Sequence, residues 1–295
     1  FAEEGGTGHY LPGSMASFLD ASPTSGSYGL KLNAVYYDGS LGRDPITISG
    51  LTLQDVKAES YALGLVGFWS PKLDLPEQWS YATAVAVPYV WVDVEGEVTA
   101  GGLQGRKSDS INGFGDIMFF PAMATYAVSP DFKVDGRLGI YAPTGRYEVG
   151  RLANTGKNYW SFEPAFGLYY FGKENGIEAT WIGAVVFNTE NEDTDYHSGT
   201  QLHMEGALAQ HFPLLGGFAG VGATAFWYDQ ITDDNGSGAV LGAFKARTMG
   251  IGPNLSWAGK LGPCELVSEV KWLPELKTRN RLEGDYIWMK LVLKF

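Results

Sequence analysis

The chain has 295 residues, of which 45% are hydrophobic and 14% aromatic, and its formal net charge is −12. This composition excludes a disordered chain, and the absence of a Lys/Arg cluster excludes nucleic acid as a partner, because phosphate binding needs concentrated positive charge. The single cysteine, Cys264, excludes a disulfide framework and a cysteine-built metal site. No apolar run approaches about 18 residues, so we expect no transmembrane helix. A first residue other than Met indicates that a leader was removed or the chain was trimmed.

The first 27 residues differ from the rest of the chain. Residues 1–27 show no strand pattern, yet Tyr10, Leu11 and Phe18 make them too apolar for a solvated tail. We therefore treat 1–27 as an N-terminal segment and 28–295 as one β domain.

Residues 28–295 consist of segments of about ten residues that are rich in aromatic and β-branched side chains. Clusters of Gly, Pro, Asn and Asp separate them, as in strands joined by turns. The predicted strands are 28–38, 56–70, 79–94, 114–127, 133–146, 158–171, 177–188, 199–212, 217–229, 246–258, 264–273 and 285–295. No convincing helix lies between any two of them.

The connections between these strands alternate in length. Long polar connections such as GSLGRDPITISGLTLQD and NTENEDTDYH follow the odd-numbered strands, whereas those after the even-numbered strands are mostly tight, such as VSPDF and GKENG. A soluble Greek-key sandwich has no reason to place every long loop at one end. The alternation is typical of an up-and-down barrel in the bacterial outer membrane.

Hydrophobic and polar side chains alternate within the predicted strands. In the last strand Ile287, Met289 and Leu291 share one phase, while Lys290 and Lys294 occupy the other. A Lys or Arg at the bilayer midplane of the lipid face costs roughly 2–4 kcal/mol. We therefore expect the apolar phase to face lipid and the charged phase to face the lumen.

These patterns together predict an all-β protein, a transmembrane up-and-down antiparallel β-barrel of about 12 strands. Its location would be the outer membrane of a Gram-negative bacterium, where the lipid bilayer and lipopolysaccharide surround it. The last strand ends in Phe295, and a terminal aromatic residue resembles the assembly signal that the barrel assembly machinery recognises. A barrel of this size has a lumen too wide to pack solid, which indicates a channel.

The predicted lumen lining is polar and contains more acidic than basic groups, so we expect a modest preference for cations. Arg137 is placed to form an ion pair with Glu163 on the neighbouring strand. The lining residues are Lys31, Asp116, Asp135, Arg137, Glu163, Gln201, His203, Glu205, Glu265, Glu269, Lys271 and Lys290.

We expect the N-terminal segment to fold into the periplasmic half of the lumen and narrow it. Its plug residues would be His9, Tyr10, Leu11 and Pro12. The alternative is a loosely ordered periplasmic tail.

Successive stretches of the chain also resemble a known family. They are GGTGHYLPGS, GFGDIMFFPAM, YAPTGRYEVGRLANTGKNYWSFEPAFGLYYF, FNTENEDTDYHSGTQLHME, GIGPNLSW and RLEGDYIWMKLVLKF. In this order they are similar to the motifs of the outer-membrane channel family named for the MetA pathway of phenol degradation. The resemblance spans nearly the whole chain. It implies a monomeric channel of about 12 strands for passive diffusion of small hydrophobic or aromatic compounds.

Two other classes of barrel remain as alternatives. A phospholipase needs Ser and His on one strand face, but His197 and Ser198 are adjacent and so point to opposite faces. A protease site beside the acidic ENEDTD loop is the harder enzyme to exclude, although such a loop is more often a solvated surface. A closed structural or receptor barrel differs from a channel only in conductance. His203 and Glu205 lack a third metal ligand, so we predict neither a metal site nor a cofactor.

Overall fold

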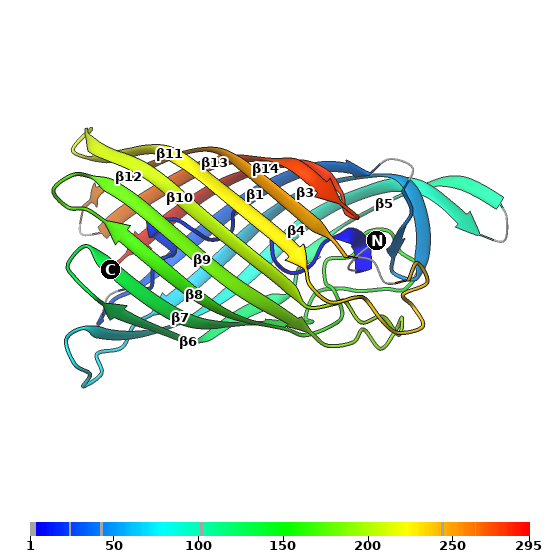
Figure 1. Ribbon diagram of the computed structural model, residues 1–295, viewed down its shortest axis with the longest axis horizontal. Coiled ribbons are helices and arrows are strands. Elements are labelled where there is room, and N and C mark those ends of the chain that lie inside the picture. Colours follow the sequence, from blue (N-terminus) through cyan, green and yellow to red (C-terminus); the bar gives the residue numbers. More distant parts are fainter. Residues whose placement is uncertain (1–3, 24, 42–43, 101–102, 243–244, 263) are drawn as a thin grey trace.

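The structure is a computed structural model that describes residues 4–23, 25–41, 44–100, 103–242, 245–262 and 264–295. Within these residues, fourteen strands form one antiparallel sheet (Figure 1). The strands are β1 (Tyr28–Leu41), β2 (Ile46–Ile48), β3 (Leu51–Trp69), β4 (Trp79–Ala100), β5 (Leu103–Phe114), β6 (Ile117–Ala127), β7 (Phe132–Ala142), β8 (Ser161–Phe171), β9 (Ile177–Asn188), β10 (Gln201–Leu214), β11 (Gly217–Gln230), β12 (Arg247–Leu261), β13 (Cys264–Arg279) and β14 (Glu283–Lys294). Two 3-10 turns, η1 (Glu4–Gly6) and η2 (Phe18–Asp20), precede them. In this described part of the chain, no helix has the length and apolar character needed to cross a bilayer.

Twelve of the strands close into a ring, which confirms the predicted antiparallel barrel. β1 pairs with β14 from Gly29 to Ser40 on one side and with β3 on the other. β3 in turn pairs with β4. The remaining neighbours follow the order of the chain from β6 to β14. Closure removes the sheet edges, so the backbone donors and acceptors of the ring find partners without water.

The two ends of the barrel differ. At one end, called the loop end below, lie the long connections that precede β8, β10 and β12. At the opposite end, called the terminal end, lie the tight turns together with the start of β1 and the C-terminus (Figure 1). The backbone N–H of Phe295 donates to the carbonyl of Tyr28 at 3.0 Å, and the two rings stack with centroids 5.6 Å apart.

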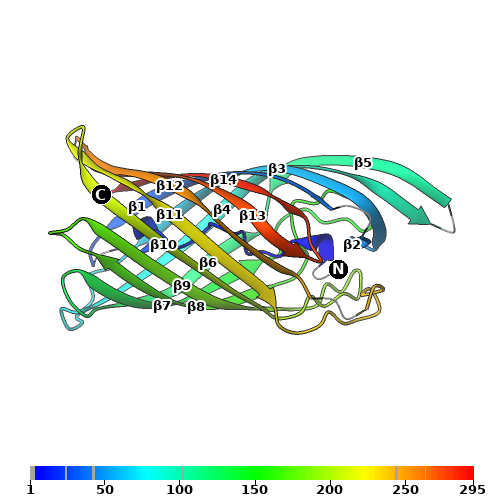
Figure 2. The same ribbon diagram turned by 45° about the horizontal axis from the view of Figure 1, so that its top comes forward.

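The structure differs from the predicted elements at the loop end. The stretch between 95 and 113 was predicted as a loop, but it contains the outer part of β4 and all of β5, which pair from Tyr89 to Ala100. This hairpin projects beyond the ring (Figures 1 and 2). The prediction was wrong because β5 lacks the apolar alternation of a half-buried strand, since water reaches both of its faces. The connection after β13 was predicted as long but spans only residues 280–282.

The outer surface of the ring is apolar. Leu208, Leu255 and Val270 are 62%, 55% and 48% exposed, whereas Glu205 and Glu269 on the same strands are buried. This arrangement inverts that of a soluble protein and suits a wall whose outer face meets hydrocarbon.

A charge in this apolar surface should be costly. Leu208 lies in the middle of β10, so Leu208→Arg should lower the free energy of unfolding from lipid vesicles by about 2–4 kcal/mol. Leu208→Ala is the control that removes the same side chain without adding charge. Urea titration of vesicle-embedded protein measures both, and equal stability of the two variants would contradict a lipid-facing position.

Candidate functional site: the lumen and its N-terminal segment

The N-terminal segment runs through the lumen from one end to the other. Glu4 lies at the loop end, where the side-chain amide of Asn191 donates to its carboxylate at 2.6 Å and Tyr147 donates to it at 2.7 Å. At the terminal end the segment continues into β1, and the two termini lie at opposite ends of the barrel (Figures 1 and 2). The segment therefore extends further than the periplasmic half predicted for it.

The middle of the segment is held by one buried carboxylate. Glu205, on β10, accepts from the Tyr10 hydroxyl at 2.8 Å and from the backbone N–H groups of Gly13 and Met15 at 2.9 and 3.1 Å. Glu205 is 1% exposed. Hydrogen bonds from three donors offset the cost of burying its charge, and they make the backbone of the segment complementary to this one side chain.

Donors on β13 and β14 hold the carbonyls of the same stretch. Lys290 donates to the Ser14 carbonyl at 2.8 Å and Lys271 to the Met15 carbonyl at 3.1 Å. The indole of Trp288 donates to the Pro12 carbonyl at 2.8 Å. Because these carbonyls have no partner within a helix or sheet, the wall side chains supply the partners that they would otherwise take from water.

Asp20 is the charged anchor of the segment near the terminal end. Its carboxylate forms ion pairs with Lys31 on β1 and, at 2.8 Å, with Lys290 on β14. Its carbonyl accepts from Arg137 on β7 at 3.0 Å. Asp20 thus joins β1 and β14, which pair with each other, to β7 on another part of the ring.

His9 fixes the segment near the loop end. One ring nitrogen lies 2.9 Å from the Asp116 carboxylate and the other lies 2.7 Å from the Ser161 hydroxyl. Backbone N–H groups of Gly145 and Lys157 donate to Asp116 at 2.9 and 2.7 Å. The carboxylate of Asp116, in the connection between β5 and β6, therefore lies within hydrogen-bond distance of His9 and of these two N–H groups.

The contact of Ser161, His9 and Asp116 resembles a hydrolase triad, but its hydrogen bonds run in another direction. The Asn188 side-chain amide donates to the carbonyls of residues 198 and 199, so its oxygen is the atom that faces Ser161 at 2.5 Å. The Ser161 hydroxyl then donates its one proton to Asn188 rather than to His9. His9 is not the base for this serine, since a nucleophile needs its proton directed at the imidazole.

Tyr147 completes the loop-end contacts. Burial, together with the neighbouring Glu4 carboxylate, raises the pKa of Tyr147 well above its usual value. The phenol therefore stays a donor to Glu4 at all physiological pH values.

The remaining predicted lining residues take several positions. Arg137 pairs with Asp135 rather than with Glu163 as predicted. Glu163 accepts from Tyr141 at 3.1 Å, and the nearest nitrogen of His203 lies 3.5 Å away.

Other residues of the predicted lining differ in their exposure and in their partners. Lys271 lies 3.2 Å from Glu269, its neighbour on β13. Gln201 is fully buried, whereas Glu265 is exposed at the terminal end of β13. His203 stacks on Tyr10, with ring centroids 3.6 Å apart, and Glu205 accepts from the hydroxyl of the same tyrosine.

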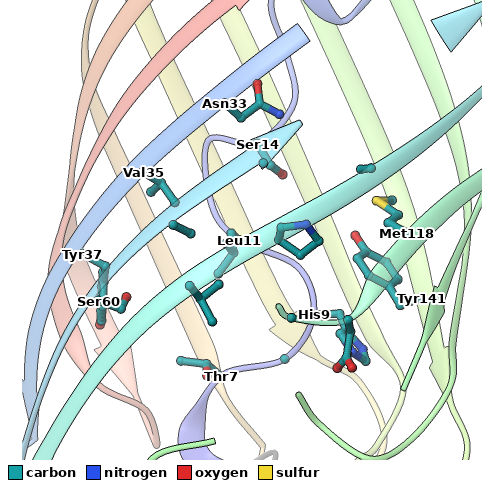
Figure 3. A pocket seen from close by; sticks show the side chains of 18 of the residues that line it. Thr7, His9, Leu11, Ser14, Asn33, Val35, Tyr37, Ser60, Met118 and Tyr141 are labelled. Atoms are coloured by element: carbon teal, nitrogen blue, oxygen red, sulfur yellow. The ribbon is translucent and has the colours of Figure 1, made fainter. Parts of the chain in front are cut away.

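The wall opposite these polar strands is apolar. The inner faces of β3 and β4 carry small and aliphatic side chains and no charge from Ala58 to Phe68 and from Ala82 to Val94. Between this wall and the segment lies a cavity of about 470 Å³. Figure 3 shows Leu11 of the segment at this cavity, with Val35 of β1 and Ser60 of β3 around it. We call the inner faces of β3 and β4 the bare wall.

The predicted lining residues were chosen because they are charged or polar, so they lie on the polar strands. The bare wall was not predicted. The signal was the size difference along β3, where Ala62 and Gly64 alternate with the larger Leu63 and Leu65. Large residues on the lipid side and small ones on the lumen side indicate that space is kept open inside. Within the described residues, no group of three His, Cys, Asp or Glu side chains is placed to hold a metal ion.

The segment should loosen when Glu205 loses its charge. In Glu205→Gln the new amide faces backbone donors that need an acceptor, and an unsatisfied buried donor costs about 1–3 kcal/mol. Amide hydrogen exchange of peptides within residues 4–27 should accelerate by about tenfold or more. Glu265→Gln makes the same change at an exposed site and should leave exchange unchanged. Equal exchange in both variants would contradict the anchoring role of Glu205.

The fold is similar to that of several solved structures. The chain is similar to the crystal structure of the COG4313 outer membrane channel from Pseudomonas putida F1, with a TM-score of 0.66 and 15% identity over 97% of this chain and 100% of that one. Lesser similarity is found to the β domain of the Bordetella autotransporter BrkA (TM-score 0.49, 12% identity, 91% and 100% covered) and to a Pseudomonas aeruginosa FadL homologue (0.41, 9%, 91% and 88%).

Sequence comparison identifies the family. No curated protein matches the sequence significantly. The sequence profile of the family described as "Putative MetA-pathway of phenol degradation" matches residues 42–291. Since this match covers most of the chain, the protein belongs to that family, and its barrel is similar in fold to that of an outer membrane channel.

Proposed function

We propose that this protein is an outer-membrane channel through which small, uncharged hydrophobic or aromatic molecules diffuse passively along the bare wall. The observation that carries the proposal is the cavity of about 470 Å³, which lies between the bare wall and a polar, hydrogen-bonded segment. A volume of this size is typical of sites that enclose one small molecule.

The chemistry of the cavity favours an uncharged cargo. A charged molecule that left water would need a charged or hydrogen-bonding partner along its whole route, and from Ala58 to Phe68 the inner face of β3 supplies no charge and only the hydroxyl of Ser60. The carboxylates of Asp20 and Asp116, which border the cavity, already bind Lys290 and His9. An apolar molecule loses no hydrogen bonds there and gains contact with the wall.

We propose that the N-terminal segment is a fixed partition of the lumen rather than a plug that leaves during transport. Its polar bonds within the lumen go to the strands from β7 to β14, to β1 and, through His9, to Asp116 just before β6, so the segment closes the polar part of the lumen and leaves the bare wall open. The plug residues His9 and Tyr10 belong to this bonded side. Their role is to narrow the channel to one apolar route.

We propose a Gram-negative outer membrane as the location, with the loop end facing lipopolysaccharide and the terminal end facing the periplasm. The length difference between the connections at the two ends supports this orientation. Phe295, paired with Tyr28 at the terminal end, is positioned to be presented to the barrel assembly machinery. The closed ring needs no second copy to complete it, which supports a monomer.

The predicted cation preference now rests on fewer groups. Glu205 and Glu269 do not border the cavity, whereas Asp20 and Asp116 do. Asp20 is paired with Lys31 and Lys290, and Asp116 already accepts hydrogen bonds from the backbone N–H groups of Gly145 and Lys157, so we propose a weaker preference than the count of lumen carboxylates implied.

Filling the route at the bare wall should block uptake. A Cβ added at Gly64 would lie 3.8 Å from the Cβ of Asn33, which is an ordinary contact distance, so Gly64→Leu should fold and project into the cavity. Gly67, on the same strand, faces outward and a Cβ there meets nothing within 4 Å, which makes Gly67→Leu the matched control. The rate at which intact cells take up radiolabelled naphthalene should fall by about fivefold or more in Gly64→Leu only.

Two results would contradict the proposed route. Uptake that is equal in Gly64→Leu, Gly67→Leu and the wild type would show that cargo does not pass the bare wall. Uptake that is no faster in wild-type cells than in cells lacking the protein would contradict the channel function itself.

Removing the partition should widen the pore. Deletion of residues 1–20 takes away His9, Tyr10 and Asp20, and water should then fill the polar part of the lumen. Single-channel conductance in planar bilayers should rise severalfold over that of the complete chain. An unchanged conductance would contradict the narrowing role, and a chain that never conducts in either form would favour the closed receptor barrel.

A further inference from the structure

The floor of the cavity, toward the terminal end, contains one aromatic side chain from the bare wall. Phe68 is the last inward-facing residue of β3, and it borders the cavity together with Leu19 of the N-terminal segment and Met123 of β6. Leu19 and Met123 are both buried. The ring of Phe68 thus lies at the end of the cavity nearest the terminal end of the barrel.

Phe68 contacts both sides of the cavity. It packs against the apolar cluster of Leu19, Val267 and Val292, which belongs to the segment and to β13 and β14. It also packs against the cluster of Ala82, Ala84 and Met123, which belongs to β4 and β6. The ring of Phe68 thus links the apolar side chains of the first cluster with those of β4 and β6 at one end of the cavity.

The neighbours of Phe68 in the sheet leave space for its ring. Gly29 on β1 and Ala84 on β4 are its cross-strand partners, so neither side carries a bulky side chain. A Cβ placed at Gly29 would lie 2.4 Å from the ring of Phe68, which shows that the ring lies over this glycine. The glycine therefore forms a niche that a larger residue would close.

The contacts of Phe68 differ in kind from those of the segment beside it. The segment is tied by charged hydrogen bonds, as at Asp20 and Lys290, whereas the ring of Phe68 has no polar atom and is held by packing alone. Packing contacts are individually weak and can be exchanged for contacts with an apolar molecule of similar shape. A passing cargo can replace the neighbours of this ring but not those of Asp20.

Building on the channel function proposed above, we infer that Phe68 sets the size limit of the channel. The ring narrows the floor of the cavity for water and ions, and it yields to a slender apolar molecule that replaces its packing contacts. The cargo is therefore limited by cross-section more than by length, because it must pass the ring of Phe68 beside Leu19 and Met123, which border the same end of the cavity. Unbranched chains and flat rings fit this requirement, and bulky branched molecules do not.

The experiment measures pore size with Phe68 replaced by smaller side chains. Single-channel conductance is recorded for the full chain in planar bilayers, in potassium chloride with polyethylene glycols of increasing mass added to find the size that no longer enters. Phe68→Ala should raise conductance about twofold or more and admit a larger polymer, with Phe68→Leu between it and the wild type. Phe166→Ala on β8 removes an equal ring from the exposed outer face and should match the wild type.

The outcomes separate this inference from the proposed function. Folding of each variant is checked by its heat-dependent mobility in detergent gels, and Phe68→Leu retains an apolar side chain if Phe68→Ala does not fold. A wild-type chain that conducts but whose exclusion size is the same in Phe68→Ala and Phe68→Leu would overturn the role of Phe68 alone. A change in Phe166→Ala as large as that in Phe68→Ala would overturn it as well. A wild-type chain that neither conducts nor takes up naphthalene would overturn the channel.

Discussion

The structure depends on the pairing of the first strand of the ring with the last. In hydrocarbon no water is present to bond exposed backbone groups, so a sheet can cross a membrane only if it has no edge. The antiparallel pairing of β1 with β14, twelve residues long, meets that requirement. It also joins residues from opposite ends of the sequence. Because Lys31 of β1 and Lys290 of β14 lie on the inner face near this seam, they bind the segment that precedes β1 through Asp20.

A closed ring of this size creates a second requirement, which is to fill its lumen. The protein fills only one part. Carboxylates such as Glu205 and cations such as Lys271 hold the N-terminal segment by backbone as well as side-chain atoms, so the filling is polar and specific. The other part is left to small apolar side chains. Burying charge beside an apolar void is tolerated because each charge has its own partner and none must face the void alone.

This division explains how one lumen provides both stability and passage. The polar bonds of the segment are directional and would be costly to break one at a time, which keeps the partition in place. The packing along the bare wall is non-directional, so its contacts can be exchanged without leaving a polar group unsatisfied. A hydrophobic molecule and the side chains of the wall interact by the same force. In the function proposed above, passage therefore needs neither a nucleotide nor movement of the segment.

The sequence alone determined the class of fold, the approximate number of strands and the face that each strand turns to lipid, because these follow from period-two alternation and loop length, which are local properties. It did not reveal β5, whose polar residues pair only because β4 continues beyond the membrane. It also pointed to charged lining residues rather than to Ala62 and Gly64, since an empty space leaves no mark on the chain except small side chains. The partners of Glu205, about 190 residues away in the chain, were decided by ring closure and by the path of the segment, which no local pattern encodes.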